Sequence, residues 1–219
     1  MDQQNLIVAK KMKASKTKFE SVLGAYYEKA TDMQIFVESV MPGMLQTSGY
    51  ATALVQSLYA GSMTAEELNA FVNRRIQWQK DRLRRITAGE LKVTVIIDEA
   101  ALHRVVGNRE IMREQLAHVE SLIDQPGLEI LVWPLNKGAL LFTFCPGVYF
   151  MTFGNQRQPV VYVEHNFTGI DTSELVDDKE AVAYYAKAFS QVTEQARRFV
   201  PDPKAFIAQI NHAEYGAPR

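Results

Sequence analysis

The spacing of apolar residues changes at Gly89, and this change limits the possible folds more than any other feature of the sequence. Before Gly89, apolar side chains recur three and four residues apart, which is the spacing of an amphipathic helix. After it, Leu91, Val93, Val95 and Ile97 alternate with other side chains, which is the spacing of a strand with one face on a core. The chain must therefore combine helices with a sheet.

Capping and turn residues indicate where the helices begin and end. Thr17–Glu20 and Thr64–Glu67 both match a capping box, in which a threonine is followed three residues later by a glutamate. Asp98 and Asn108 are suitable N-cap residues, and Pro203 suits the first turn of a helix. The helices predicted in this way cover residues 17–30, 33–40, 48–59, 64–86, 98–107, 108–123, 178–199 and 203–214.

Four further runs after the first strand are typical of strands. They are Leu128–Leu135, Ala139–Cys145, Val148–Phe153 and Pro159–Glu164, and short Gly, Pro and Asn turns separate them, so these later strands are expected to be antiparallel. The predicted fold is α+β, with a mixed, largely antiparallel sheet of about five strands packed by N-terminal and C-terminal helices. We expect residues 1–17 to be a flexible lead-in and residues 18–219 to form a single domain without a helix-turn-helix.

Composition excludes several classes of function. The chain has 24 Lys and Arg against 25 Asp and Glu, so it lacks the basic excess that binding to DNA normally requires. The one basic cluster, Arg82–Arg85, is interpreted as a solvated helix end rather than a phosphate site. The single cysteine, Cys145, fits a reducing compartment, and neither a signal peptide nor a membrane span is evident, so we expect a cytoplasmic protein.

No cofactor or metal is expected from the sequence. It contains no glycine-rich phosphate loop, and the four histidines lack metal-ligand spacing: His103, His118, His165 and His212.

Three polar residues occupy positions where the pattern calls for apolar ones. Arg75 and Gln79 lie on the apolar stripe of the helix predicted at 64–86, and Glu99 follows the strand at a position that points to the core. A buried arginine needs a carboxylate partner, for which Glu99 and Glu164 are the candidates. Such a pair could bind and transform a ligand, with Glu99 as an acid/base, or could only fix the packing of helix on sheet.

Other side chains near these residues could complete a site. Trp78, Trp133 and Phe142 could form aromatic walls, although each type is more often part of a core. His103 lies four residues after Glu99 and is also a candidate.

Several short motifs occur in order along the chain: Phe36–Glu38, Val40–Thr47, Tyr50 with Ala51, Arg75 with Gln79, Ile97–Leu102, Gln115 with Leu116, Val132–Leu135 and Val161–Glu164. The series resembles the domain of unknown function that follows the helix-turn-helix in many XRE-type regulators of actinomycetes, over about residues 18 to 210. Only about seventeen residues precede it here, too few for a DNA-binding domain, and Trp78 stands where the family usually has a second basic residue.

The chain also resembles the type of Pictet–Spengler enzyme that forms the β-carboline core of marinacarbolines. That resemblance implies a homodimer, a catalytic glutamate matching Glu99, and a helping arginine matching Arg74 or Arg75. The stripe favours Arg75, and a histidine associated with that site has no match here. We therefore expect a biosynthetic enzyme that condenses a tryptophan-like amino acid with an aldehyde. The alternative is a non-catalytic domain that senses a ligand or binds a partner protein.

Overall fold

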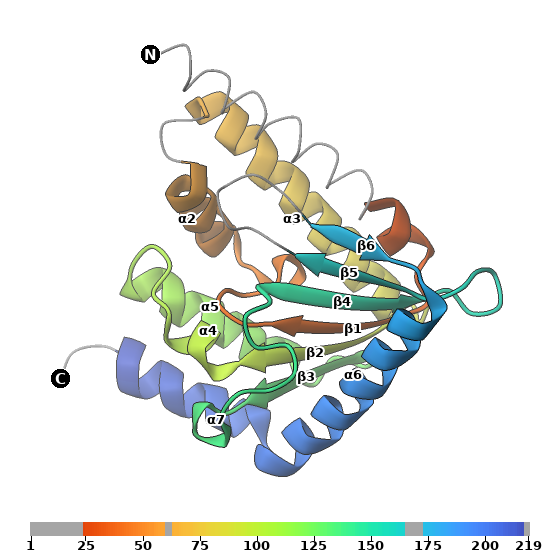
Figure 1. Cartoon of the computed structure of the whole chain (residues 1–219). Coiled ribbons are helices and arrows are strands. Elements are labelled where there is room, and N and C mark those ends of the chain that lie inside the picture. The colour runs from red at the N-terminus through yellow and green to blue at the C-terminus, as the bar shows by residue number, and fades with distance from the viewer. Residues whose placement is uncertain (1–23, 60–62, 165–172, 217–219) are drawn as a thin grey trace.

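The computed structural model describes residues 24–59, 63–164 and 173–216. Its centre is a mixed six-stranded sheet with the order β3-β2-β1-β4-β5-β6 (Figure 1). This confirms the α+β class, with one strand more than expected. The strands are β1 (Asp32–Val37), β2 (Lys92–Asp98), β3 (Leu128–Trp133), β4 (Gly147–Thr152), β5 (Val160–Glu164) and β6 (Glu174–Val176).

The sheet has a parallel half and an antiparallel half that meet at β1. β1, β2 and β3 are parallel to one another, whereas β4, β5 and β6 each run antiparallel to the strand before them in the sheet. Helices connect the parallel strands, because a parallel pair needs a long crossover, and short connections suffice for antiparallel pairs. The expectation of antiparallel later strands is therefore correct for β4 and β5 and wrong for β3, which follows a helix.

Two of the predicted elements are wrong. Residues 33–40 were expected to be helical, but β1 occupies most of them, with Ile35 and Phe36 both fully buried on opposite faces. A strand buried on both faces is an almost continuous apolar run without a clear period of two. Residues 139–145 were expected to be a strand, yet they form turns, in which Phe142 is buried and Phe144 is exposed.

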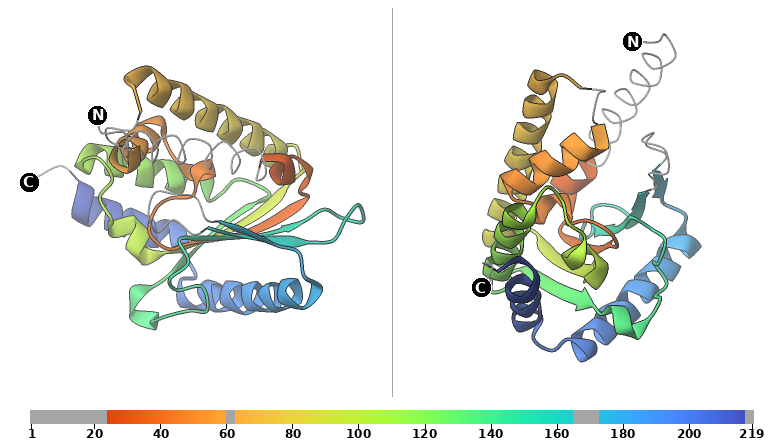
Figure 2. Two further views of the ribbon diagram at one scale, coloured as in Figure 1. Left: turned by 45° about the horizontal axis from the view of Figure 1, so that its top comes forward. Right: turned by 90° about the vertical axis from the view of Figure 1, so that its left-hand side faces the viewer.

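The helices lie in two layers on either side of the sheet (Figure 2). α2 (Ser48–Tyr59), α3 (Ala65–Thr87) and α5 (Arg109–Leu122) cover one face, and α6 (Lys179–Phe199) covers the other. α4 (Glu99–His103) follows β2, while α7 (Pro203–Ile210) continues into a π-helical turn, η3 (Asn211–Tyr215). Short 3-10 turns occupy Gly43–Leu45 (η1) and Leu135–Lys137 (η2).

The predicted caps explain where these helices begin. Thr64 and Glu67 form the expected capping box of α3, and the side chains of Asp98 and Asn108 cap α4 and α5. The capping box expected at Thr17–Glu20 lies outside the described residues. None of the described helices is long and apolar enough to span a membrane.

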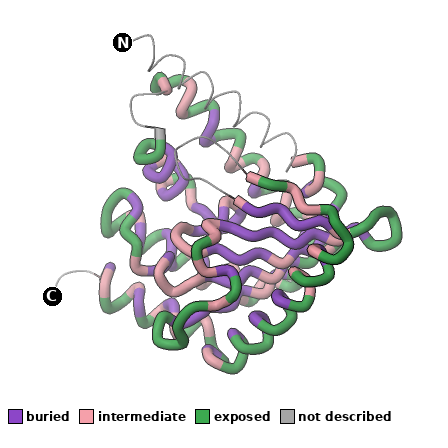
Figure 3. The backbone as a smooth tube through the Cα atoms, in the orientation of Figure 1, coloured by how far each residue is buried: buried purple, intermediate pink, exposed green. Residues whose placement is uncertain are grey.

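The strands β1 to β5 are largely buried (Figure 3). The core therefore has two main parts, one on each side of the sheet, and a small third cluster lies between α2 and α3. The larger part lies between the sheet and the helices of the α3 face and includes Met33, Val95 and Tyr149. The smaller part lies under α6 and includes Phe36 and Trp133. Any site on this sheet must therefore form at an edge or where polar residues interrupt one of these layers.

Candidate functional site

A small polar cavity interrupts the core on the α3 face. Its volume is about 70 Å³, and its wall is formed by the helical residues 24–29, the η1 turn, α3, β4 and β5. The residues that line it are Gly24, Tyr27, Pro42, Gly43, Met44, Arg75, Trp78, Arg82, Tyr149 and Glu164. This volume is far below the roughly 300–1,000 Å³ of pockets that enclose whole drug-sized ligands. It suits a charged head group or a few water molecules.

Among the residues that the structure describes, the charged groups in the wall give the cavity a net positive charge. Two guanidinium groups, Arg75 and Arg82, face one carboxylate, Glu164. The two tyrosines are neutral: burial raises the pKa of Tyr27 to about 12, and burial together with the nearby Glu164 raises the pKa of Tyr149 well above its usual value. The Tyr149 hydroxyl lies 3.1 Å from Glu164 Oε1, to which it donates a hydrogen bond.

Arg75 has hydrogen-bonding capacity that the described residues do not use. Its Nη2 group lies 3.4 Å from Gln46 Oε1, and the guanidinium lies 5.7 Å from the centre of the Phe71 ring. Its buried Nε–H has no acceptor among the described residues. A β-carbon placed on Gly43 would come within 2.9 Å of Arg75 Nη2, so glycine lets the loop approach the guanidinium closely. Arg75 is thus held in place with a donor still available.

Three buried glutamines fix the loop that carries Gly43. Gln79 Nε2 donates to the backbone oxygen of Gln46 at 2.7 Å, and Gln46 Nε2 donates to that of Met41, also at 2.7 Å. Gln115 donates to the backbone oxygen of Leu45 and accepts from the backbone N–H of Thr47. Gln79, expected to contact substrate, instead holds the backbone of the loop.

The structure distinguishes between the two arginines that the sequence left open. Arg75 lines the cavity, whereas Arg74 is exposed. Trp78, one turn after Arg75, also lines the cavity and is partly exposed.

The interpretation of Arg82–Arg85 as a solvated helix end is largely wrong. The Arg82 guanidinium lies 3.8 Å from the centre of the Tyr27 ring and lines the cavity. Arg85 donates to the backbone oxygens of Tyr27 and Ala30 at 2.6 and 2.7 Å, and so caps the helical segment that ends at residue 29. Of these three arginines, only Arg84 is exposed.

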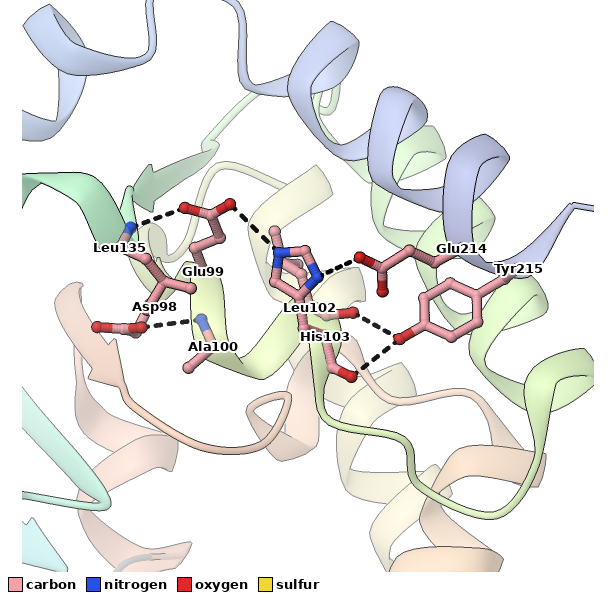
Figure 4. Close-up of polar contacts among 8 residues, drawn as sticks. All are labelled: Asp98, Glu99, Ala100, Leu102, His103, Leu135, Glu214 and Tyr215. Carbon is pink, nitrogen blue, oxygen red and sulfur yellow. Dashed lines mark hydrogen bonds and ion pairs between the residues drawn. The ribbon is translucent and has the colours of Figure 1, made fainter.

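Glu99 lies in a different cluster, at the carboxyl ends of the parallel strands (Figure 4). Its Oε2 accepts a hydrogen bond from the backbone N–H of Leu135 at 2.7 Å, and its Oε1 lies 3.2 Å from His103 Nε2. The other ring nitrogen, His103 Nδ1, lies 2.6 Å from Glu214 Oε1. Arg75 and Glu99 therefore have separate partners, and of the two carboxylates considered for Arg75 only Glu164 shares its cavity.

The pKa values of two residues here, His103 and Asp98, are raised. Burial lowers the pKa of His103, but its hydrogen bonds to Glu99 and Glu214 raise the pKa by more, so that it lies above the ordinary value. Burial and the nearby Glu38 and Glu99 raise the pKa of Asp98. Among the described residues, no group of three or more histidine, cysteine or acidic side chains is arranged to hold a metal ion.

Two of the expected aromatic walls belong to the core under α6. Trp133 is buried against Phe199 with its Nε1–H bonded to the backbone oxygen of Gly138, and Phe142 packs on Phe36 and Phe189. Neither lines the cavity. The sequence did not indicate Gly24, Tyr27 or Tyr149 as cavity residues, and Arg82 was interpreted as part of a solvated helix end. The alternation of β4 places Tyr149 on the α3 face, but no local pattern shows that a cavity lies there.

The fold and the cavity together define the class of protein. It is a mixed α+β domain with a positively charged cavity on one face of its sheet. The chain belongs to the family described as a domain of unknown function, DUF5753, whose model matches residues 22–205. No curated protein and no solved structure gives a significant match.

Proposed function

We propose that the protein binds a small organic anion, a carboxylate, through Arg75 and Arg82 in the cavity of the α3 face. The observation that carries this proposal is that Arg75, whose buried Nε–H has no acceptor among the described residues, lines the same cavity as a second guanidinium, Arg82. A buried donor without an acceptor costs free energy, and a bound carboxylate would satisfy it. Ligand binding, as in a sensing domain, is therefore the function that this geometry supports best.

The charge and the size of the cavity restrict the ligand. Two guanidiniums against one carboxylate favour a single negative charge, and a planar carboxylate matches the fork of an arginine. A volume of about 70 Å³ admits the carboxylate, while the rest of the ligand would lie against the partly exposed Trp78. An aromatic or planar body is favoured there, because Trp78 offers a ring face.

Tryptophan fluorescence can test this proposal directly. The chain has two tryptophans, and Trp133 lies in the other part of the core, so Trp133→Phe leaves Trp78 as the only reporter. Titration with phenylacetate is expected to change the Trp78 emission in a saturable way, whereas benzylamine, a cation of similar shape, is expected to have no effect. Calorimetry on the unmodified chain gives the affinity without relying on the reporter.

Two neighbouring arginines provide the matched comparison. Arg75→Gln is expected to weaken phenylacetate binding at least tenfold, which corresponds to about 1.4 kcal/mol or more. Arg74→Gln removes the same charge from the exposed side of the helix and is expected to leave binding unchanged. An equal loss of affinity in both variants would mean that the anion is attracted only by the general positive charge, and the proposed site would be wrong.

A second candidate, the acid/base condensation of an aromatic amino acid with an aldehyde at Glu99, is favoured by one observation. Glu99 and His103 form a partly exposed carboxylate–imidazole pair beyond the carboxyl ends of parallel strands, where α/β proteins commonly bind ligands. Incubation with L-tryptophan and small aldehydes, followed by mass spectrometry, tests for a cyclised product. Identical product traces from the wild type and from Glu99→Gln would exclude catalysis by Glu99.

A further inference from the structure

The loop between β3 and β4 crosses the carboxyl ends of the two strands that separate them. β2 and β1 lie between β3 and β4 in the sheet, so residues 134–146 must pass over the ends of both. Each of these two strands is followed by a carboxylate that accepts a hydrogen bond from a backbone N–H of the loop. Glu99, after β2, accepts from Leu135 at 2.7 Å, and Glu38, after β1, accepts from Phe144 at 3.0 Å.

The C-terminal turn η3 is attached to α4 beside this loop. The Tyr215 hydroxyl donates towards the backbone oxygens of Leu102 and His103, each at 3.1 Å, and the Glu214 carboxylate faces His103 Nδ1. The His103 ring therefore lies between Glu214 of η3 and Glu99 of α4, and Glu99 in turn holds the loop (Figure 4).

We propose that His103 acts as a proton-operated clasp, which fastens the C-terminal turn to the crossover loop when its ring is doubly protonated. Ionised carboxylates can only accept hydrogen bonds, so both ring nitrogens must carry hydrogen for both contacts to form. Neutral imidazole has one N–H and can donate to only one of the two carboxylates. Loss of the proton therefore releases one side of the clasp, while the Tyr215 hydrogen bonds remain.

The surrounding charges support retention of the proton. Glu99 from α4 and Glu214 from η3 face the ring directly, and Asp98 caps the same helix. Tyr215 of η3 interacts electrostatically with both Glu214 and Arg109 of α5. The carboxylates raise the pKa of His103 in spite of its burial. Because the pKa is higher in the folded than in the unfolded chain, the clasp stabilises fully below about pH 6.5. Its contribution is lost as the pH rises through the folded pKa.

The test uses the unliganded chain, so its result does not depend on either proposed function. NMR titration of the histidine ring protons, with His103 assigned from the His103→Asn variant, is expected to give a pKa above the ordinary value for His103. Glu214→Gln is expected to lower this pKa. Glu194→Gln, which removes an exposed carboxylate from α6, serves as the matched control and should leave it unchanged.

Hydrogen exchange then reports on the clasp itself. After correction for the intrinsic pH dependence of exchange, amides in residues 211–216 should exchange up to about fivefold faster above the His103 pKa than below it. This pH dependence should disappear in Glu214→Gln, an isosteric change at a partly exposed position that is expected to leave the fold intact. An unshifted His103 pKa, or corrected exchange rates that do not change with pH in the wild type, would overturn the proposal.

Discussion

Arg75 and Gln79 lie on the same stripe of α3, yet their side chains serve different purposes. Gln79 is buried and donates to a backbone oxygen of the 41–47 loop, while Arg75 reaches the cavity with one donor unused. The Arg75 guanidinium lies against Gly43 and the Gln46 side chain, whereas the Gln79 amide is bonded to the loop backbone itself. An inward polar residue on a helix can therefore be a structural link or part of a site, and only the position of the loop distinguishes them.

Replacing Gln79 is expected to destabilise the fold. Gln79→Leu would leave the backbone oxygen of Gln46 buried without its donor, which should lower the free energy of unfolding by about 1–3 kcal/mol. Urea denaturation measures this change. The exposed Gln77→Leu on the same helix is the control and should stay within about 0.5 kcal/mol of the wild type. Equal effects at the two positions would contradict the structural function of Gln79.

Much of the site could not be predicted from the sequence, because it depends on where the 41–47 loop lies. The inward direction of Arg75 and Gln79 followed from helical spacing alone and is confirmed for both. Both contact the same residue, Gln46, which lies 29 positions before Arg75 and 33 positions before Gln79. These contacts depend on how the loop folds back onto α3. Pairing Arg75 with Glu99 failed because two inward residues on successive elements need not meet.

At the scale of elements, arginines of α3 fasten the helical segment that precedes β1. Arg85 caps it through two backbone oxygens, and Arg82 stacks on Tyr27, whose ring lines the cavity. The attachment of this segment therefore determines one wall of the proposed binding site.

Loss of the Arg85 cap should lower the free energy of unfolding by more than the loss of a surface charge does. Arg85→Met removes two hydrogen bonds to otherwise unpaired carbonyls at a helix end, and should lower the free energy of unfolding by about 1–3 kcal/mol. Arg84→Met removes the same charge from the exposed face and should change it by less than about 0.5 kcal/mol. Chemical denaturation of both variants decides whether Arg85 is a cap or only a surface charge.

The elements themselves were predictable to the extent that one face of each was polar. α2, α3, α5 and α6 were expected close to their observed limits, because each has capping residues and an exposed side. β1 was missed because both of its faces are buried, and β6 because three residues carry too little pattern. The segment around Phe142 resembles a strand only by its apolar composition; its turns insert that one ring into the core.

At the scale of the whole molecule, the sheet separates the proposed site from the second part of the core. Trp78 and the cavity lie on the α3 face, and Trp133 and Phe142 lie on the α6 face. These aromatic residues, which the sequence pattern does not distinguish, are therefore expected to behave differently on substitution.

Substitutions on the α6 face should mainly affect stability, whereas substitutions at the cavity should mainly affect binding. Phe142→Ala is expected to lower the free energy of unfolding by about 3–5 kcal/mol through a cavity in the core, while the folded fraction still binds phenylacetate. Trp78→Ala removes a partly exposed side chain, so it should weaken binding while costing less stability. Thermal unfolding and calorimetry on both variants measure the two quantities. If Phe142→Ala abolished binding in the folded protein, this separation would be wrong.

The central position of β1 has a consequence for synthesis of the chain. Of the described strands, the one that ends at Val37 is made first, but its two neighbours begin at Lys92 and Gly147. At translation rates of about 5–20 residues per second, its β4 edge stays unpaired for roughly 5 to 20 seconds. During that interval Ile35, Phe36 and Val37 form a short apolar segment with open edges, of the kind that aggregates or recruits chaperones. Yield in the cell should therefore depend on how quickly the ribosome reaches β4 as well as on the stability of the finished fold.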